Sequence, residues 1–134
     1  MTYLGKGITI AILDSGIESN HFQFTGRVLT EVCIAQAKKV GTQESPFCKN
    51  GKSIHVGLGA ASTLNKSGVV MSNHGNRTAS VFLEFAPSAK IIMIRSQSEL
   101  KSLQWIDANK LKYKIAGIIW NSAELPYFNS GSKK

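Results

Sequence analysis

Residues 7–13, GITIAIL, together with Asp14-Ser15-Gly16 directly after them, decide the fold class. The run is almost wholly apolar and rich in β-branched residues, which is typical of a strand buried on both faces of a parallel sheet. Asp-Ser-Gly is favourable turn chemistry and ends the strand. Ligand sites in parallel sheets lie beyond the carboxyl ends of the strands, so Asp14 stands where chemistry is expected.

Strand and helix alternate along the rest of the chain. We expect further strands over 26–34, 90–95 and 115–120, and helices over 74–85 and 99–112. Pro87 should end the first helix. Ser98 is a favourable N-cap for the second helix, and its apolar stripe is expected to comprise Leu100, Leu103, Ile106 and Leu111. The sequence therefore predicts an α/β fold, a partial parallel sheet of three or four strands with flanking helices.

The segment 36–72 has a different texture. Gly, Ser, Lys, Asn and Thr dominate it, and no hydrophobic period persists. We therefore expect one long loop, and loops of this length are usually functional or disordered.

The overall composition fits one globular domain. The chain has 134 residues, of which 43% are apolar and 18% charged. Its net charge of +8 comes from scattered lysines and arginines without a nucleic-acid-binding signature, so a solvated basic surface is the simpler interpretation. No apolar run reaches the ~18 residues of a membrane span, and the N-terminus does not resemble a signal peptide. The compartment stays open.

Two cysteines, Cys33 and Cys48, are too few for a structural zinc site, which requires four ligands. They either form one disulfide or are two separate buried thiols. The sequence alone leaves both alternatives open.

Two polar residues stand where strands end and helices begin. Asp14 ends the first strand, and His74 opens the first helix. Taken singly, Asp14 is more simply interpreted as a turn carboxylate and His74 as a helix-start histidine. The residues on either side of Asp14 and His74 favour a more specific interpretation.

The stretch from Gly5 to Val28 resembles the aspartate segment of subtilisin-like serine peptidases, with Phe22 in place of the family's proline. NHGNRTASVFLEFAPSAKIIMIRS resembles the family's histidine segment, and the loop around Cys48 resembles a cysteine-containing loop of one bacterial branch. The resemblance covers residues 5–124. It implies that 1–134 is a single partial subtilisin-like peptidase domain, in which 125–134 form a frayed tail.

The resemblance also implies site residues. Asp14 would orient the imidazole and His74 would act as general base, as in a Ser-His-Asp triad. The substrate-binding edge would correspond to Ser122 and Ala123. We expect a peptide or protein substrate, no cofactor and no metal, since Glu18 is a single carboxylate. Members of the family are mostly secreted.

The nucleophile of the family pattern is missing. No Gly-Thr-Ser occurs in the chain, and the asparagine of the oxyanion hole would lie after residue 124. We therefore expect a truncated serine endopeptidase domain, inactive by itself. The alternative is a non-catalytic pseudopeptidase that holds a peptide or a protein. Arg77, Thr78 and Ser80 replace family residues after His74, which we interpret as relaxed constraint.

Binding to nucleic acid or membrane is not expected. A partial sheet would leave 91–94 and 115–120 exposed and apolar, which favours self-association or a complementing chain.

Overall fold

The structure, a computed structural model, describes residues 4–36 and 46–121. Its elements in chain order are β1 (Thr9–Leu13), β2 (Val28–Ile34), β3 (Ile54–Val56), α1 (His74–Phe85), β4 (Lys90–Ser96), α2 (Glu99–Tyr113) and β5 (Ile115–Trp120). None of the helices in this part of the chain is long and apolar enough to cross a membrane. The predicted α/β class is confirmed.

The five strands form one sheet in the order β3-β2-β4-β1-β5. β1 pairs in parallel with both β4 and β5, and β2 pairs in parallel with β4. β3 runs antiparallel to β2. The carboxyl ends of the four parallel strands therefore meet at one edge of the sheet.

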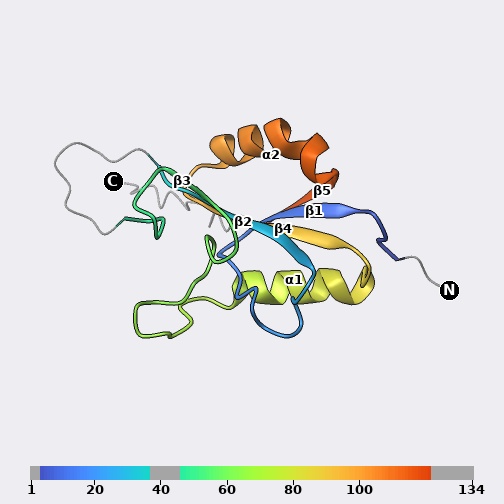
Figure 1. Cartoon of the computed structure of the whole chain (residues 1–134), viewed down its shortest axis with the longest axis horizontal. Helices are drawn as coiled ribbons and strands as arrows, with labels where there is room; N and C mark the ends of the chain where they lie inside the picture. The colour runs from blue at the N-terminus through green and yellow to red at the C-terminus, as the bar shows by residue number, and fades with distance from the viewer. Residues whose placement is uncertain (1–3, 37–45, 122–134) are drawn as a thin grey trace, which may run out of the picture.

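The sheet lies between two helices, with α1 on one face and α2 on the other (Figure 1). Side chains alternate between the two faces along each strand. Ile12 and Met93 belong to the core on the α1 side, whereas Leu13 and Ile92 belong to the core on the α2 side. Both faces of β1 are thereby buried, as the apolar run over 7–13 predicted.

The helix termini agree with the sequence. α1 ends at Phe85, two residues before Pro87. Ser98 caps α2, since its hydroxyl accepts a hydrogen bond from the backbone N–H of Lys101. The predicted apolar stripe of α2 is wrong in two places, because Leu100 is 66% exposed and Leu111 88% exposed.

Ile106 is the apolar residue of the stripe that α2 buries, together with Ser102. Trp105 and Tyr113 complete the contact with the sheet. This row faces the sheet in place of the predicted stripe.

The expectation of one long loop over 36–72 is wrong for residues 54–56. They form β3, whose three residues pair with Val32, Cys33 and Ile34 of β2. A strand of three residues is too short to show a period in the sequence. Backbone pairing with the outer edge of β2 is what makes it a strand.

The predicted exposure of 91–94 is also wrong. Ile91, Ile92, Met93 and Ile94 are at most 1% exposed, because β4 lies in the middle of the sheet with a helix on each face. β5 stands at the edge of the described sheet, where Ile118 and Trp120 are nearly half exposed.

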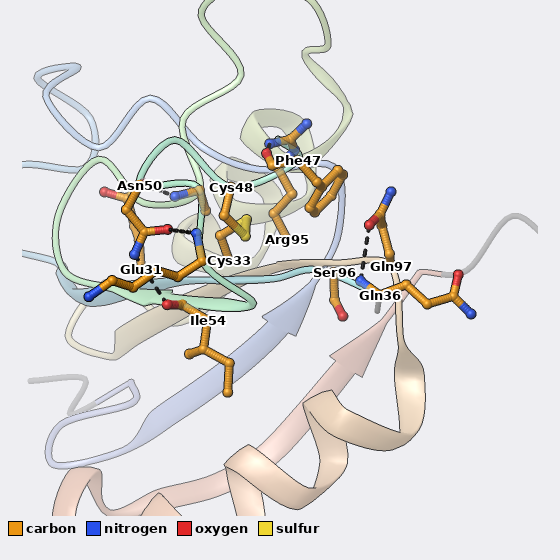
Figure 2. Close-up of a disulfide and its surroundings, with 12 residues drawn as sticks. Glu31, Cys33, Gln36, Phe47, Cys48, Asn50, Ile54, Arg95, Ser96 and Gln97 are labelled. Atoms are coloured by element: carbon orange, nitrogen blue, oxygen red, sulfur yellow. Dashed lines mark hydrogen bonds between the residues drawn. A yellow bond between two sulfur atoms is a disulfide. The ribbon is translucent and has the colours of Figure 1, made fainter. Parts of the chain in front are cut away.

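A disulfide links β2 to the segment before β3. The sulfurs of Cys33 and Cys48 are 2.11 Å apart, and both residues are fully buried. Figure 2 shows the bridge with Phe47 and Arg95 beside it. The bond fixes the segment 46–49 above the carboxyl end of β2.

Candidate active site

Asp14 and His74 meet at the carboxyl edge of the sheet. Asp14 follows β1, and its backbone N–H donates to the carbonyl of Ile94. His74 is the first residue of α1. Its Nδ1 lies 2.7 Å from Asp14 Oδ1 and 3.0 Å from Oδ2. The carboxylate is buried, with 2% of the side chain exposed, whereas the imidazole is 65% exposed.

Ser15 aligns the helix with the turn. Its hydroxyl oxygen accepts a hydrogen bond from the backbone N–H of Gly75 at 3.0 Å and another from the Ser72 hydroxyl at 2.9 Å. Asn73, the residue at the N-cap of α1, makes no capping bond with its side chain. The backbone N–H of Gly75, which has no partner within α1, is thus hydrogen-bonded by the turn that carries Asp14.

Gly75 permits this close approach. A Cβ at this position would overlap the carbonyl oxygen of Gly16. Any larger residue would push α1 away from the turn, and His74 would move with it.

The Asp14 carboxylate accepts three hydrogen bonds besides those from His74. The donors are the backbone N–H of Ser15 at 2.6 Å, Thr78 Oγ1 at 2.8 Å and Asn121 Nδ2 at 3.2 Å. Burial by itself raises the pKa of Asp14, but these donors and His74 outweigh it and hold the pKa below its ordinary value. Asp14 is therefore ionised at neutral pH.

The interpretation of Thr78 as relaxed constraint is not supported. Its hydroxyl donates to Asp14 and accepts from Asn121 Nδ2 at 3.0 Å. A valine at this position could do neither. Sequence reasoning noted the change at Thr78 but missed its function, because a hydroxyl four residues after a histidine gives no sign of its partner.

Glu18 ties the same turn to the long segment before α1. Its carboxylate accepts from the hydroxyls of Ser62 and Thr63 and from the backbone N–H of Thr63. No group of three or more His, Cys, Asp or Glu side chains within 4–36 and 46–121 is arranged to hold a metal ion. Hydrogen-bond donors of the chain itself occupy the Glu18 oxygens.

Glu31 is a second carboxylate that sequence reasoning missed. It is fully buried in β2 and accepts hydrogen bonds from Ser19 Oγ at 2.6 Å and from the backbone N–H groups of Gly59 and Ala61. The carbonyl of Ala61 in turn accepts from the N–H of Ile17. A lone carboxylate inside the apolar strand VLTEVCI was the available signal.

A cavity of about 1060 Å³ opens beside the pair. Asp14, Ser15 and Ser72 line it, together with residues of 46–49 and 62–66. Arg95 and Ser96, at the end of β4, also line it. Its walls come from segments far apart in the sequence, so no local pattern predicts it.

The other two histidines lie outside this arrangement. His21 is exposed. His55 is half-buried in β3, and its Nδ1 is buried without a hydrogen-bond partner among the residues that the structure describes. Ser122 and Ala123, predicted to bind substrate, lie outside the described residues.

The geometry defines what the pair can do. With Nδ1 bound to an ionised carboxylate, Nε2 is the ring nitrogen left to exchange a proton. A carboxylate at Nδ1 is also the position that the acid of a Ser-His-Asp triad occupies relative to the imidazole.

Comparison with known protein families gives a match over most of the chain. A family model described as the subtilase family, Peptidase S8, matches residues 5–124, the same range over which the sequence resembles these peptidases. No solved structure matches the chain. Because the match spans most of the 134 residues, the chain belongs to the subtilase family of serine peptidases.

Proposed function

We propose that this chain supplies the acid and the base of a serine endopeptidase site, and that residues 1–134 do not hydrolyse peptides by themselves. The observation that carries the proposal is the 2.7 Å contact between His74 Nδ1 and Asp14 Oδ1. Removal of an ionised carboxylate from water costs free energy, and the contact with the imidazole offsets that cost. The same contact suits proton transfer by the imidazole.

His74 acts as general base in this proposal. Its Nε2 accepts the proton of an attacking serine hydroxyl, and the imidazolium then returns a proton to the leaving amine. Asp14 stays ionised throughout, because Ser15, Thr78 and Asn121 donate to it in addition to His74.

The serine and the oxyanion donors would come from outside these residues. No Gly-Thr-Ser occurs in the sequence. Removal of a single oxyanion donor costs ~10²–10³ in rate, and the residual catalysis of a damaged triad depends on an intact hole and binding pocket. With the nucleophile and the hole both lacking, the expected activity is negligible.

Fluorophosphonate labelling tests the proposal directly. The purified chain and a His74→Ala variant are treated with the probe, and hydrolysis of a fluorogenic peptide is followed in parallel. We expect neither labelling nor hydrolysis with either protein. Labelling of the wild-type chain that disappears in His74→Ala would show an activated serine within these residues and would contradict the proposal.

A non-catalytic peptide-binding module is the second candidate. The cavity of about 1060 Å³ beside Asp14 favours it, because binding there requires no nucleophile. Saturable peptide binding with no turnover would support this function, and release of cleaved peptide would exclude it.

We expect one domain over 1–134 and a peptide or protein as ligand rather than nucleic acid or membrane. Self-association or a complementing chain would cover Ile118 and Trp120 on β5. Sedimentation velocity over a range of concentrations tests this: a single monomeric species throughout would contradict self-association.

A further inference from the structure

Three cationic side chains line the cavity beside the Asp14–His74 pair. They are Lys49, Lys66 and Arg95, and they come from the segment after the disulfide, from the segment before α1 and from β4. Asp14 is the one acidic residue among the described residues that line it, and its oxygens already accept hydrogen bonds from four residues. The cavity therefore has excess positive charge.

Arg95 is held in one place. It is half-buried, its Nη1 donates to the carbonyl of Phe47 at 3.1 Å, and its guanidinium carbon lies 4.1 Å from the centre of the Phe47 ring. Cys48, next to Phe47, is tied to β2 by the disulfide. Figure 2 shows the arginine extending from the strand toward Phe47 beside this bridge. The guanidinium is thus positioned by the chain before any ligand arrives.

The charge of this guanidinium is not neutralised within the described part of the chain. The ion pairs found there join His74 to Asp14 and Lys110 to Asp107. A guanidinium has five N–H donors, and the structure shows one of them in use, on Phe47. Burial lowers the pKa of Arg95.

We infer that this cavity binds the carboxylate side chain of an acidic peptide, with Arg95 as the principal contact and Lys49 and Lys66 as flanking charges. A carboxylate matches the fork of a guanidinium with two parallel hydrogen bonds. The cavity adjoins the Asp14–His74 pair, so a glutamate or aspartate held there belongs to a peptide that lies across the site. The inference rests on the proposed function, since it names the kind of peptide that the same site selects.

Peptide binding measured by fluorescence anisotropy tests the inference. The probes are two labelled alanine-based hexapeptides, one with two adjacent glutamates and the other with glutamines at the same positions. The proteins are the wild-type chain, Arg95→Met, Arg95→Lys and Lys112→Met. Lys112 is exposed on α2 and does not line the cavity, so Lys112→Met removes the same charge elsewhere.

We expect the wild-type chain to bind the glutamate peptide about tenfold more tightly than the glutamine peptide, a loss of this preference in Arg95→Met, and partial retention in Arg95→Lys. Lys112→Met should keep the preference. If Arg95→Met does not fold, the double variant Lys49→Met/Lys66→Met replaces it, because both lysines are exposed, and it should lose several-fold of the preference.

Equal affinity for the two peptides, or an equal loss in Lys112→Met, would overturn the inference while leaving the proposed function intact. Absence of binding to either peptide would contradict a peptide-holding function as well. The two failures are therefore distinguishable.

Discussion

The hydroxyl of Thr78 donates to Asp14 Oδ2 at 2.8 Å, and this contact joins two residues that are 64 positions apart in the sequence. His74 contacts the same carboxylate from one helical turn earlier in α1. The helix therefore holds Asp14 at two points, through an imidazole and through a hydroxyl. Asn121, after β5, donates to both Thr78 and Asp14 and closes the arrangement.

Replacement of this hydroxyl tests its contribution. In Thr78→Val, the pKa of Asp14 is expected to rise and the free energy of unfolding to fall by about 1–2 kcal/mol, because a buried carboxylate loses a donor. Carboxyl-carbon NMR titration and urea unfolding measure the two effects. Thr78→Ser, which keeps the hydroxyl, is the control. An unchanged titration in Thr78→Val would show that the contact does not influence Asp14.

Asp14 also makes stability depend on pH. Its pKa in the folded chain is lowered, so the stabilisation is fully present above the unfolded value of ~3.9 and is lost as pH falls through the folded value. The wild-type chain should therefore have a larger free energy of unfolding than Asp14→Asn at neutral pH. This difference in free energy should shrink below about pH 4.

Urea unfolding at several pH values measures this difference. Asp107→Asn is the control, because Asp107 is 75% exposed in its ion pair with Lys110 and surface pairs contribute little. A stability difference between the wild-type chain and Asp14→Asn that stays constant down to the lowest pH would contradict a lowered pKa of Asp14 in the folded chain.

Close approach at Gly75 is the third testable feature. Gly75→Ala places a methyl group against the carbonyl of Gly16, and backbone on both sides prevents easy relief. We expect a loss of several kcal/mol in unfolding free energy, of the order of severe overpacking. The comparison is Gly117→Ala in β5, where the new methyl would lie 3.1 Å from the flexible end of Ile10. Equal losses of unfolding free energy in the two variants would show that the close approach at Gly75 does not limit the position of α1.

The buried carboxylate of Glu31 should be sensitive to an isosteric change. In Glu31→Gln the amide nitrogen faces donors, since Ser19, Gly59 and Ala61 all donate to the carboxylate. Roughly 1–3 kcal/mol should be lost, and the amides of Gly59 and Ala61 should exchange faster with solvent. Hydrogen exchange followed by NMR gives the second readout. Glu99→Gln serves as the control, because Glu99 is exposed. Equal exchange rates of the Gly59 and Ala61 amides in the two variants would show that the Glu31 carboxylate does not hold these two amides.

Reduction of the disulfide should destabilise the chain. The bridge spans 15 positions, and closure of a loop of that size contributes ~3 kcal/mol in the chain-entropy model. Urea unfolding with and without reductant measures the loss, and a Cys33→Ala/Cys48→Ala variant should no longer respond to reductant. Identical unfolding midpoints for the wild-type chain under both conditions would contradict this expectation.

The sequence by itself determined the order of the main strands and both helices, and it placed Asp14 after a strand and His74 at a helix start. These are local properties: a buried run such as GITIAIL, the turn chemistry of Asp-Ser-Gly, the cap at Ser98 and the stop before Pro87 all act within a few residues. The parallel arrangement then implied that Asp14 and His74 would share one edge of the sheet.

Only the tertiary structure decided which other side chains complete the site. Thr78, Glu31 and Arg95 gain their functions from partners that lie 12 to 64 positions away in the sequence. In the same way, β3 depends on its pairing with β2. Hydrogen-bond partners and cavity walls depend on where the backbone places segments that are distant in the sequence. The type of a residue does not indicate which of these segments will lie beside it. The sequence thus located Asp14 and His74, while long-range packing decided which side chains hold them and what charge surrounds them.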